Sequence, residues 1–345
     1  MRVADFDYTL PPEMIAQHPV EPRDASRLLV LDRASGAIEH ARFRDLPRYL
    51  EPGDLLVAND SRVIRARLYG RKRTGGRVEV LLLRPLAPER WEALVGGQRL
   101  REGAELLLGT VGEEEPAAEG GVSARVAEVR ADGTRVLAFS AAVEPLLERR
   151  GAVPLPPYIH EPLGDPERYQ TIYARVAGSV AAPTAGLHFT PELIGRLHER
   201  GARFAFVTLH IGLDTFRPVE VEDTSAHTMH SEWCAVPAAV AEAVAETRRA
   251  GRRVVAVGTT AVRALETAAQ EGPIRPYHGW TRLFITPGTP VRVVDTLLTN
   301  FHLPRSTLLM LVSAMAGRER ILAAYREAIA QGYRFYSFGD AMLIR

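Results

Sequence analysis

A hydroxyl and an imidazole side chain lie four residues apart within residues 178–190, a segment with few bulky side chains. These groups belong to Thr184 and His188, and Pro183 and Gly186 accompany them. Proline removes a backbone donor and glycine lacks a Cβ, so we expect a tight turn rather than a helix or a strand. Such a turn can hold a polar ligand or transfer protons. The alternative is a structural loop in which His188 bonds a local carbonyl.

The residues after this turn predict the start of a helix. Thr190 is a typical N-cap, and Pro191 and Glu192 suit the first helical turn. The first N–H groups of a helix lack partners within the helix, so they favour anionic ligands. The polar turn therefore ends beside a potential anion site.

A second polar segment is predicted at residues 254–266, where a buried strand breaks at Gly258 and continues as a helix. We expect Thr259 or Thr260 to cap this helix. Arg263, one turn further on, could pair with a carboxylate through two parallel hydrogen bonds. An ordinary N-cap with an arginine ion pair is the structural alternative, because such junctions occur throughout α/β domains.

Histidines follow predicted regular structure in two more places. His210 ends an apolar strand at residues 203–209 and precedes Asp214 and Arg217, while Asn300 and His302 precede an apolar stretch. Imidazole titrates near neutrality, which suits proton transfer, although a histidine at a strand end is often a buried structural residue. The recurrence of such polar segments favours a binding or catalytic site.

Positive charge is concentrated between residues 62 and 77. No Asp or Glu lies between these seven basic residues: Arg62, Arg65, Arg67, Arg71, Lys72, Arg73 and Arg77. On an extended backbone they would form a basic stripe that can contact phosphates. A solvated strand face is the alternative interpretation.

Common cofactor motifs are missing from the sequence. It contains neither the P-loop pattern nor G-x-G-x-x-G after a strand, which disfavours a simple kinase, dehydrogenase or Rossmann methyltransferase. His227, His230 and Cys234 lack the number and spacing of zinc ligands, so we predict no metal site. Cys234 is the single cysteine, which excludes an internal disulfide.

Composition is that of a soluble globular protein. The 345 residues are 46% hydrophobic and 25% charged, with a formal net charge of +1. The near-neutral balance means that any nucleic-acid contact must come from local patches. Apolar runs are far shorter than the ~20 residues that span a bilayer, and the N-terminal residues lack a signal-peptide pattern. We therefore expect a cytoplasmic protein without membrane contact.

The order of the elements predicts an α/β fold with an insertion. Strands alternate with helices before residue 62 and after residue 150, which is typical of a mostly parallel sheet covered by helices. Short alternating strands separated by glycine pairs fill residues 62–150, which is typical of a small antiparallel barrel. We therefore predict a discontinuous α/β catalytic domain, residues 1–61 and 151–345, and an inserted β-barrel domain, residues 62–150.

Individual elements are predicted from apolar patterns. We expect helices at residues 10–17, 191–200, 238–250 and 318–331. Outside the insertion we expect strands at residues 27–32, 37–43, 54–58, 203–209, 253–257, 282–285 and 334–338.

Several long strings of residues together resemble the S-adenosylmethionine:tRNA ribosyltransferase-isomerase family of queuosine biosynthesis. The resemblance covers the whole chain. The strings lie at residues 15–17, 23–29, 59–64 (NDSRVI), 179–189, 229–232 (MHSE), 257–263, 299–314 and 336–344. Asp214 departs from the family pattern.

The resemblance implies transfer and isomerisation of the ribosyl part of S-adenosylmethionine. The acceptor would be 7-aminomethyl-7-deazaguanine at the wobble position of tRNA, giving epoxyqueuosine and releasing adenine and methionine. S-adenosylmethionine would be a consumed substrate, so no cofactor is implied, and we expect a monomer.

Roles follow from this resemblance together with side-chain chemistry. His188, His210 and His302 are candidates for proton transfer. Thr184, Thr259, Thr260 and Asn300 would position the sugar and the amino acid, with Arg263 or Arg217 on the methionine carboxylate. Arg62, Arg65, Arg67, Arg71 and Lys72 would contact the RNA.

Two other classes of protein remain possible from the sequence. A noncatalytic RNA-binding protein would explain the basic stripe and the barrel, but not the four polar segments. An S-adenosylmethionine-dependent RNA methyltransferase is disfavoured by the missing glycine motif.

Overall fold

The computed structural model describes residues 1–97, 100–109, 122–212, 219 and 221–345. The chain forms two compact units. The first comprises residues 1–62, 156–177 and 182–345, and the second comprises residues 63–155 and 178–181. We propose that these units correspond to the α/β and barrel domains predicted from the sequence, a correspondence that limited proteolysis near both boundaries tests.

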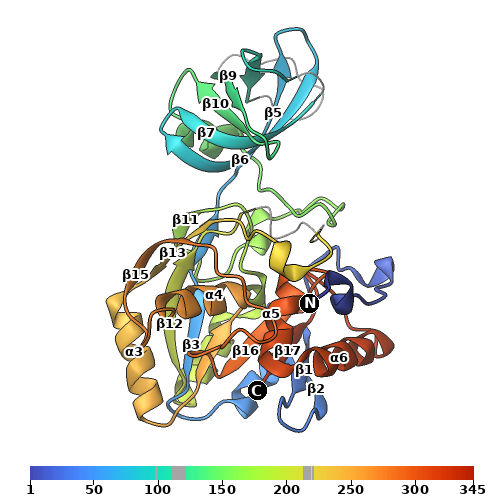
Figure 1. Cartoon of the computed structure of the whole chain (residues 1–345), viewed down its shortest axis with the longest axis vertical. Coiled ribbons are helices and arrows are strands. Elements are labelled where there is room, and N and C mark those ends of the chain that lie inside the picture. The colour runs from blue at the N-terminus through green and yellow to red at the C-terminus, as the bar shows by residue number, and fades with distance from the viewer. Residues whose placement is uncertain (98–99, 110–121, 213–218, 220) are drawn as a thin grey trace. The chain divides into compact units, whose positions relative to one another are not determined.

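A nine-stranded sheet is the centre of the first unit (Figure 1). Its spatial order is β15-β13-β12-β3-β14-β16-β17-β1-β2. The strands are β1 (Arg27–Leu31), β2 (Ile38–Arg42), β3 (Leu55–Asn59), β12 (Arg203–Leu209), β13 (Glu232–Val236), β14 (Val254–Val257), β15 (Tyr277–Thr281), β16 (Thr296–Asn300) and β17 (Ala341–Ile344).

The sheet is mixed in direction. The pairs β12·β3, β3·β14, β14·β16 and β17·β1 are parallel. The other neighbours, β15·β13, β13·β12, β16·β17 and β1·β2, are antiparallel. Every residue of β3, β14, β16 and β17 is buried, as expected for strands covered on both faces.

Helices cover both faces of this sheet. They are α2 (Pro191–Glu199), α3 (Ala238–Arg249), α4 (Thr259–Ala268), α5 (Thr307–Ala316) and α6 (Arg318–Ala330). On one face, apolar side chains of α2 and of the 3-10 segment Phe43–Tyr49 pack against alternate residues of the central strands. Helix α4 packs against β12, β13 and β15, and Figure 1 shows α4 and α5 in front of the sheet.

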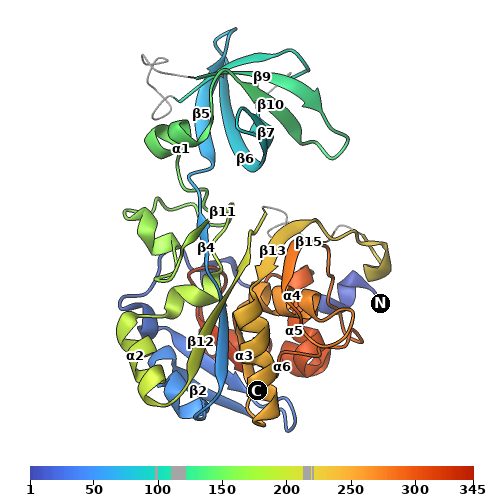
Figure 2. The ribbon, with the colours of Figure 1, turned by 90° about the vertical axis from the view of Figure 1, so that its left-hand side faces the viewer.

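The second unit contains a closed antiparallel barrel of order β10-β7-β6-β5-β8-β9. Its elements are β5 (Arg67–Lys72), β6 (Arg77–Ala87), β7 (Arg90–Gly96), β8 (Glu105–Leu108), β9 (Val122–Val129), β10 (Arg135–Phe139) and α1 (Glu144–Arg150). All of these except β8 are labelled in Figure 2. Gly70 lies so near β8 that an added Cβ would be 2.2 Å from the Leu107 oxygen, so this position requires glycine. Strands β4 (Ser61–Val63) and β11 (Val176–Ser179) form a separate two-stranded sheet.

The predicted fold class is confirmed: a large sheet with helices, interrupted by an inserted small antiparallel barrel. The helices predicted at residues 191–200, 238–250 and 318–331 are confirmed as α2, α3 and α6. As predicted, the Thr190 hydroxyl caps α2 by accepting a hydrogen bond from the Leu193 N–H, at 3.1 Å.

Three local predictions were wrong. Residues 10–17 contain only the 3-10 segment Pro12–Met14, because Pro11 and Pro12 limit the backbone donors. The strand expected at residues 282–285 is displaced to β15 (Tyr277–Thr281). The strand expected at residues 334–338 is a turn, and β17 follows it. The tight turn expected within residues 178–190 is confirmed as the 3-10 turn Thr184–His188, while the first two residues of this range belong to β11.

Candidate active site

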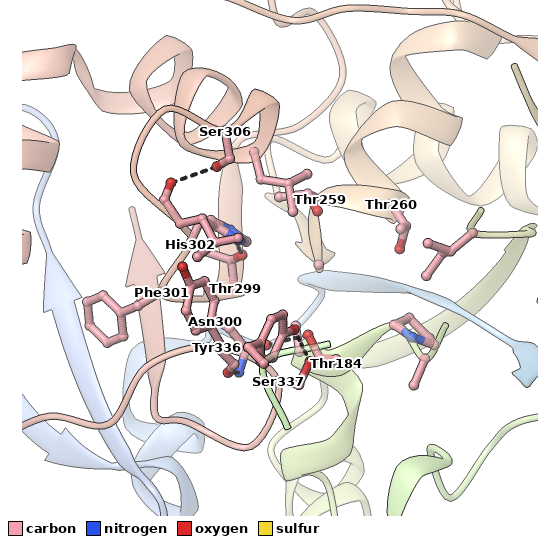
Figure 3. Close-up of a pocket in the computed structure, with 18 residues that line it drawn as sticks. Thr184, Thr259, Thr260, Thr299, Asn300, Phe301, His302, Ser306, Tyr336 and Ser337 are labelled. Atoms are coloured by element: carbon pink, nitrogen blue, oxygen red, sulfur yellow. Dashed lines mark hydrogen bonds between the residues drawn. The ribbon is translucent and has the colours of Figure 1, made fainter. Parts of the chain in front are cut away.

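A pocket opens where several strands of the first unit end. It collects the residues that follow β14 and β16, the 3-10 turn Thr184–His188 and the turn that precedes β17 (Figure 3). Ligands of open α/β sheets favour this edge, outside the carboxyl ends of the strands. About 650 Å³ of space lies within the pocket and its open mouth, which is within the usual range for small-molecule sites. Its polar lining includes Tyr158, Thr184, Thr259, Thr260, Thr299, Asn300, His302, Ser306, Tyr336 and Ser337.

The first turn of α4 forms one part of the lining. Its N-cap is Gly258, at φ 89°, so the prediction that Thr259 or Thr260 caps the helix was wrong. The two threonines instead occupy the first helical turn, ahead of the Ala261 N–H that bonds Gly258. The Thr260 Oγ1 atom is buried and has no hydrogen-bond partner among the described residues. The pocket lining therefore includes the first turn of a helix, whose N–H groups lack partners within the helix, together with this hydroxyl.

Asn300 orders the floor of the pocket through its side-chain amide. Its Oδ1 accepts a hydrogen bond from the Thr184 hydroxyl at 3.0 Å. Its Nδ2 donates to the Tyr336 carbonyl and contacts His188 Nε2, both at 3.2 Å. One amide at the end of β16 thus joins three segments that are far apart in the sequence.

His188 contacts the Asn300 amide and is itself held by two neighbours. Its ring stacks on Phe43 with centroids 4.8 Å apart, and its Nδ1 lies 2.8 Å from the Ser26 hydroxyl. That hydroxyl donates to the Arg23 carbonyl, so Nδ1 carries the proton and Nε2 accepts from Asn300. Desolvation, with contributions from Arg334 and Arg23, lowers the pKa of His188 to about 3. The ring is neutral and both its nitrogens are occupied.

His302 lies in the pocket wall itself. Its Nε2 is 2.8 Å from the Thr299 hydroxyl, and its backbone is held by Tyr8 and Tyr325. Desolvation lowers the pKa of His302 to about 3, so this ring is also neutral at physiological pH. The expectation that these imidazoles titrate near neutrality was wrong, because burial penalises the charged form.

His210 and Arg263 lie outside the pocket lining. The His210 ring stacks on Trp233 at 5.1 Å, and desolvation lowers its pKa. The Arg263 guanidinium is buried and hydrogen-bonded to the Glu232 carboxylate and the Leu283 carbonyl. The structure thus places Arg263 in an internal ion pair between α4 and β13. Arg217 and Asp214 lie outside the described residues.

Two aromatic residues of the pocket were not singled out by the sequence analysis. Tyr336 stacks on Tyr158 with ring centroids 4.6 Å apart, and the Tyr158 hydroxyl is 2.7 Å from Ser337 Oγ. Tyr336 has φ 70°, which is uncommon for a bulky residue. Its segment, residues 336–344, contributed to the family resemblance, but no sequence pattern indicated that the ring faces a pocket.

The basic residues proposed for RNA contact differ in their surroundings. Arg62 pairs with Glu167 at 2.5 Å, Arg67 with Glu79 at 3.1 Å and Arg73 with Glu105 at 2.8 Å. Arg65 is exposed, and Arg71 and Lys72 are half-buried in β5. The expectation of an uncompensated stripe was therefore wrong in part, because carboxylates distant in sequence neutralise three members.

The described residues contain no cluster of three or more His, Cys, Asp or Glu side chains that could hold a metal ion. They also contain no helix long and apolar enough to cross a bilayer.

The fold is that of an α/β protein with a pocket at the strand ends and an inserted barrel. The sequence profile described as "Queuosine biosynthesis protein" matches residues 3–344. The chain therefore belongs to the queuosine biosynthesis protein family.

Relatives match along their full length. The S-adenosylmethionine:tRNA ribosyltransferase-isomerase of Symbiobacterium thermophilum is 59% identical over 353 residues, with 100% of both chains covered. The protein of the same name from Moorella thermoacetica is 57% identical over 350 residues, again covering 100% of both. The crystal structure of S-adenosylmethionine tRNA ribosyltransferase from Thermotoga maritima aligns with a TM-score of 0.57 and 44% identity, covering 99% of this chain and 100% of that one.

Proposed function

We propose that this chain is an S-adenosylmethionine:tRNA ribosyltransferase-isomerase. It transfers and isomerises the ribosyl moiety of S-adenosylmethionine onto 7-aminomethyl-7-deazaguanine at the tRNA wobble position. The products are epoxyqueuosine in the tRNA, adenine and methionine. The observation that carries this proposal is the pocket ordered by Asn300, found in a chain that matches the family from end to end.

The pocket suits a positively charged sulfonium substrate. A protonated imidazole would repel that cation, whereas His302 is neutral and lines the wall. A neutral imidazole is also the form that can accept a proton from the carbon beside the sulfonium. His302 is accordingly our candidate for contact with the reacting part of the substrate, and His188 becomes a positioning residue that acts through Asn300.

We assign the methionine carboxylate to a partner other than Arg263, because Arg263 does not line the pocket and its guanidinium already pairs with Glu232, leaving only the buried Nη2 without a partner among the described residues. The first turn of α4 offers the backbone N–H groups of Thr259 and Thr260 and the Thr260 hydroxyl, which has no partner within the described ranges. Such an arrangement favours an anion. We assign the carboxylate to this turn, and Thr184 and Asn300 to the sugar.

The tRNA requires contacts beyond the pocket. We assign its phosphates to Arg65, Arg71, Lys72, Arg62 and Arg67, the last two of which also pair with carboxylates. No bound cofactor is required in this proposal, since S-adenosylmethionine is consumed. We further propose that the enzyme is monomeric and cytoplasmic.

Isotopic labelling tests the proposal. S-adenosylmethionine labelled in the ribose should transfer label to tRNA that carries the aminomethyl-deazaguanine base, whereas label in the S-methyl group should leave with methionine. Methyl label on the RNA, with formation of S-adenosylhomocysteine, would show a methyltransferase instead. Binding of tRNA without consumption of S-adenosylmethionine would show a noncatalytic RNA-binding protein.

A further inference from the structure

Tyr336 carries a buried hydroxyl that is unbonded in the described part of the chain. The residue is only 5% exposed, and its hydroxyl oxygen has no hydrogen-bond partner among the described residues. A buried polar group without a partner costs about 1–3 kcal/mol, so native proteins seldom retain one without a use. The ring lines the pocket, where a ligand can supply the missing partner.

The backbone holds this side chain in an unfavourable conformation. Tyr336 has φ 70°, where most non-glycine residues are strained. The turn around it is fixed by Asp340, whose carboxylate accepts from the Arg334 N–H at 2.8 Å, and by Gly339, whose N–H donates to the Tyr336 carbonyl at 2.9 Å. Strain maintained by such surrounding bonds is typical of functional sites.

The pocket has two chemically different ends. Tyr336 and Tyr158 form an aromatic stack, while Thr259 and Thr260 present hydroxyls and helix N–H groups. Figure 3 shows the threonines of α4 and the Tyr336 ring on different sides of the pocket. An aromatic wall favours a flat nucleobase, and a helix N-terminus favours a carboxylate.

We propose that Tyr336 binds the adenine base of S-adenosylmethionine, its hydroxyl donating a hydrogen bond to a ring nitrogen, while Thr260 contacts the amino-acid end. This inference rests on the proposed function and adds the orientation of the substrate. Adenine ring nitrogens are acceptors, and a tyrosine hydroxyl kept neutral can donate to them. Burial raises the pKa of Tyr336, which keeps that proton in place.

The test combines two substitutions with two ligands in isothermal titration. S-adenosylhomocysteine carries both ends of the substrate, and 5′-deoxy-5′-methylthioadenosine carries the base and sugar but no amino acid. Tyr336→Phe should weaken both ligands by a similar factor, about 5- to 10-fold. Thr260→Val should weaken S-adenosylhomocysteine alone. The 1-deaza, 3-deaza and 7-deaza forms of methylthioadenosine identify the acceptor, since one of the three should bind Tyr336→Phe and the unsubstituted protein equally well.

Tyr173→Phe provides a matched control. Its hydroxyl is also buried without a partner among the described residues, but Tyr173 does not line the pocket. Both Tyr→Phe substitutions remove an unsatisfied polar atom, so neither should lower the melting temperature of the ligand-free protein. Tyr173→Phe should leave both affinities unchanged.

Three outcomes would overturn the inference. Unchanged ligand affinity in Tyr336→Phe would do so, as would weakening of S-adenosylhomocysteine without weakening of methylthioadenosine. A lower melting temperature together with weaker binding would show that the hydroxyl has a structural role. Failure of the unsubstituted protein to bind S-adenosylmethionine would instead contradict the proposed function itself.

Discussion

The Nε2 atom of His188 lies 3.2 Å from the Nδ2 atom of Asn300. This contact determines which of these groups donates the hydrogen bond and which accepts it. Because Nδ2 is a donor, Nε2 must be unprotonated, and Asn300 Oδ1 is directed toward Thr184. A protonated His188 could not accept this bond. The neutral state of the histidine and the orientation of the amide therefore depend on one another.

Substitutions of His188 distinguish positioning from proton transfer. Gln at this position can place its Oε1 near the original Nε2 and still accept from Asn300, whereas Asn is too short to do so. We expect His188→Gln to retain more activity than His188→Asn or His188→Ala, with turnover in the last two lower by about 100-fold. Steady-state kinetics with saturating tRNA measures this difference.

The pH profile provides the control for this substitution. If His188 only positions Asn300, the pH dependence of kcat in His188→Gln should match that of the unsubstituted protein. Equal loss of activity in all three variants, with a changed pH profile, would assign proton transfer to His188.

Stability should fall as the pH is lowered below neutrality. His188 and His302 have pKa values near 3 when folded and 6.5 as the ordinary value, so between these limits the unfolded chain binds more protons. The stabilisation is complete above pH 6.5 and decreases on acidification, by at most about 1.4 kcal/mol per pH unit for each histidine. Urea denaturation at pH 7, 6 and 5 measures this slope, and His188→Gln should reduce it by about one proton.

Breaking the Arg263–Glu232 ion pair should lower the stability of the fold rather than the affinity for substrate. Arg263→Met removes a cation from a buried carboxylate, and we expect the free energy of unfolding to fall by about 3–5 kcal/mol. The double substitution Arg263→Met with Glu232→Met should recover much of this loss. A large decrease in S-adenosylmethionine affinity at unchanged stability would instead show that Arg263 binds the substrate carboxylate.

Barrel substitutions test the RNA contacts. Replacing Arg65 and Arg71 with Ala should weaken tRNA binding and reduce the slope of log K against log salt by roughly one unit per lost phosphate contact. Affinity for S-adenosylmethionine should stay the same. Arg249→Ala, an exposed position on α3, is the control. An unaltered salt slope would place the RNA site elsewhere.

Most strands and helices could be predicted from the sequence, because apolar runs and capping residues determine them within a few residues of the chain. The buried runs of β1, β3 and β14 and the Thr190 cap of α2 were readable directly from the sequence. Residues 282–285 failed as a strand because Ile285 is buried without strand pairing. Such a segment has the composition of a strand but lacks a neighbour.

The site was less predictable than the fold. Thr184, Asn300 and His302 lie in the pocket as expected, and the segments that carry them could be found from their polar residues at strand ends. Their roles depend on partners distant in sequence, as in the bond between His188 and Ser26 or that between Arg263 and Glu232. The αL backbone of Tyr336 is imposed by its surroundings, so no local pattern indicates it.

The pairing of β17 between β1 and β16 affects how the chain folds during its synthesis on the ribosome. Leu28 of β1 pairs with Ala341, and β17 also pairs with β16, so a central strand of the sheet is supplied by residues 341–344. Until those residues emerge, the β1–β2 hairpin has an unpaired edge, and such edges promote aggregation. Pairing over so great a sequence separation also slows folding. We expect the nascent chain to depend on chaperones until β17 joins β1 to β16.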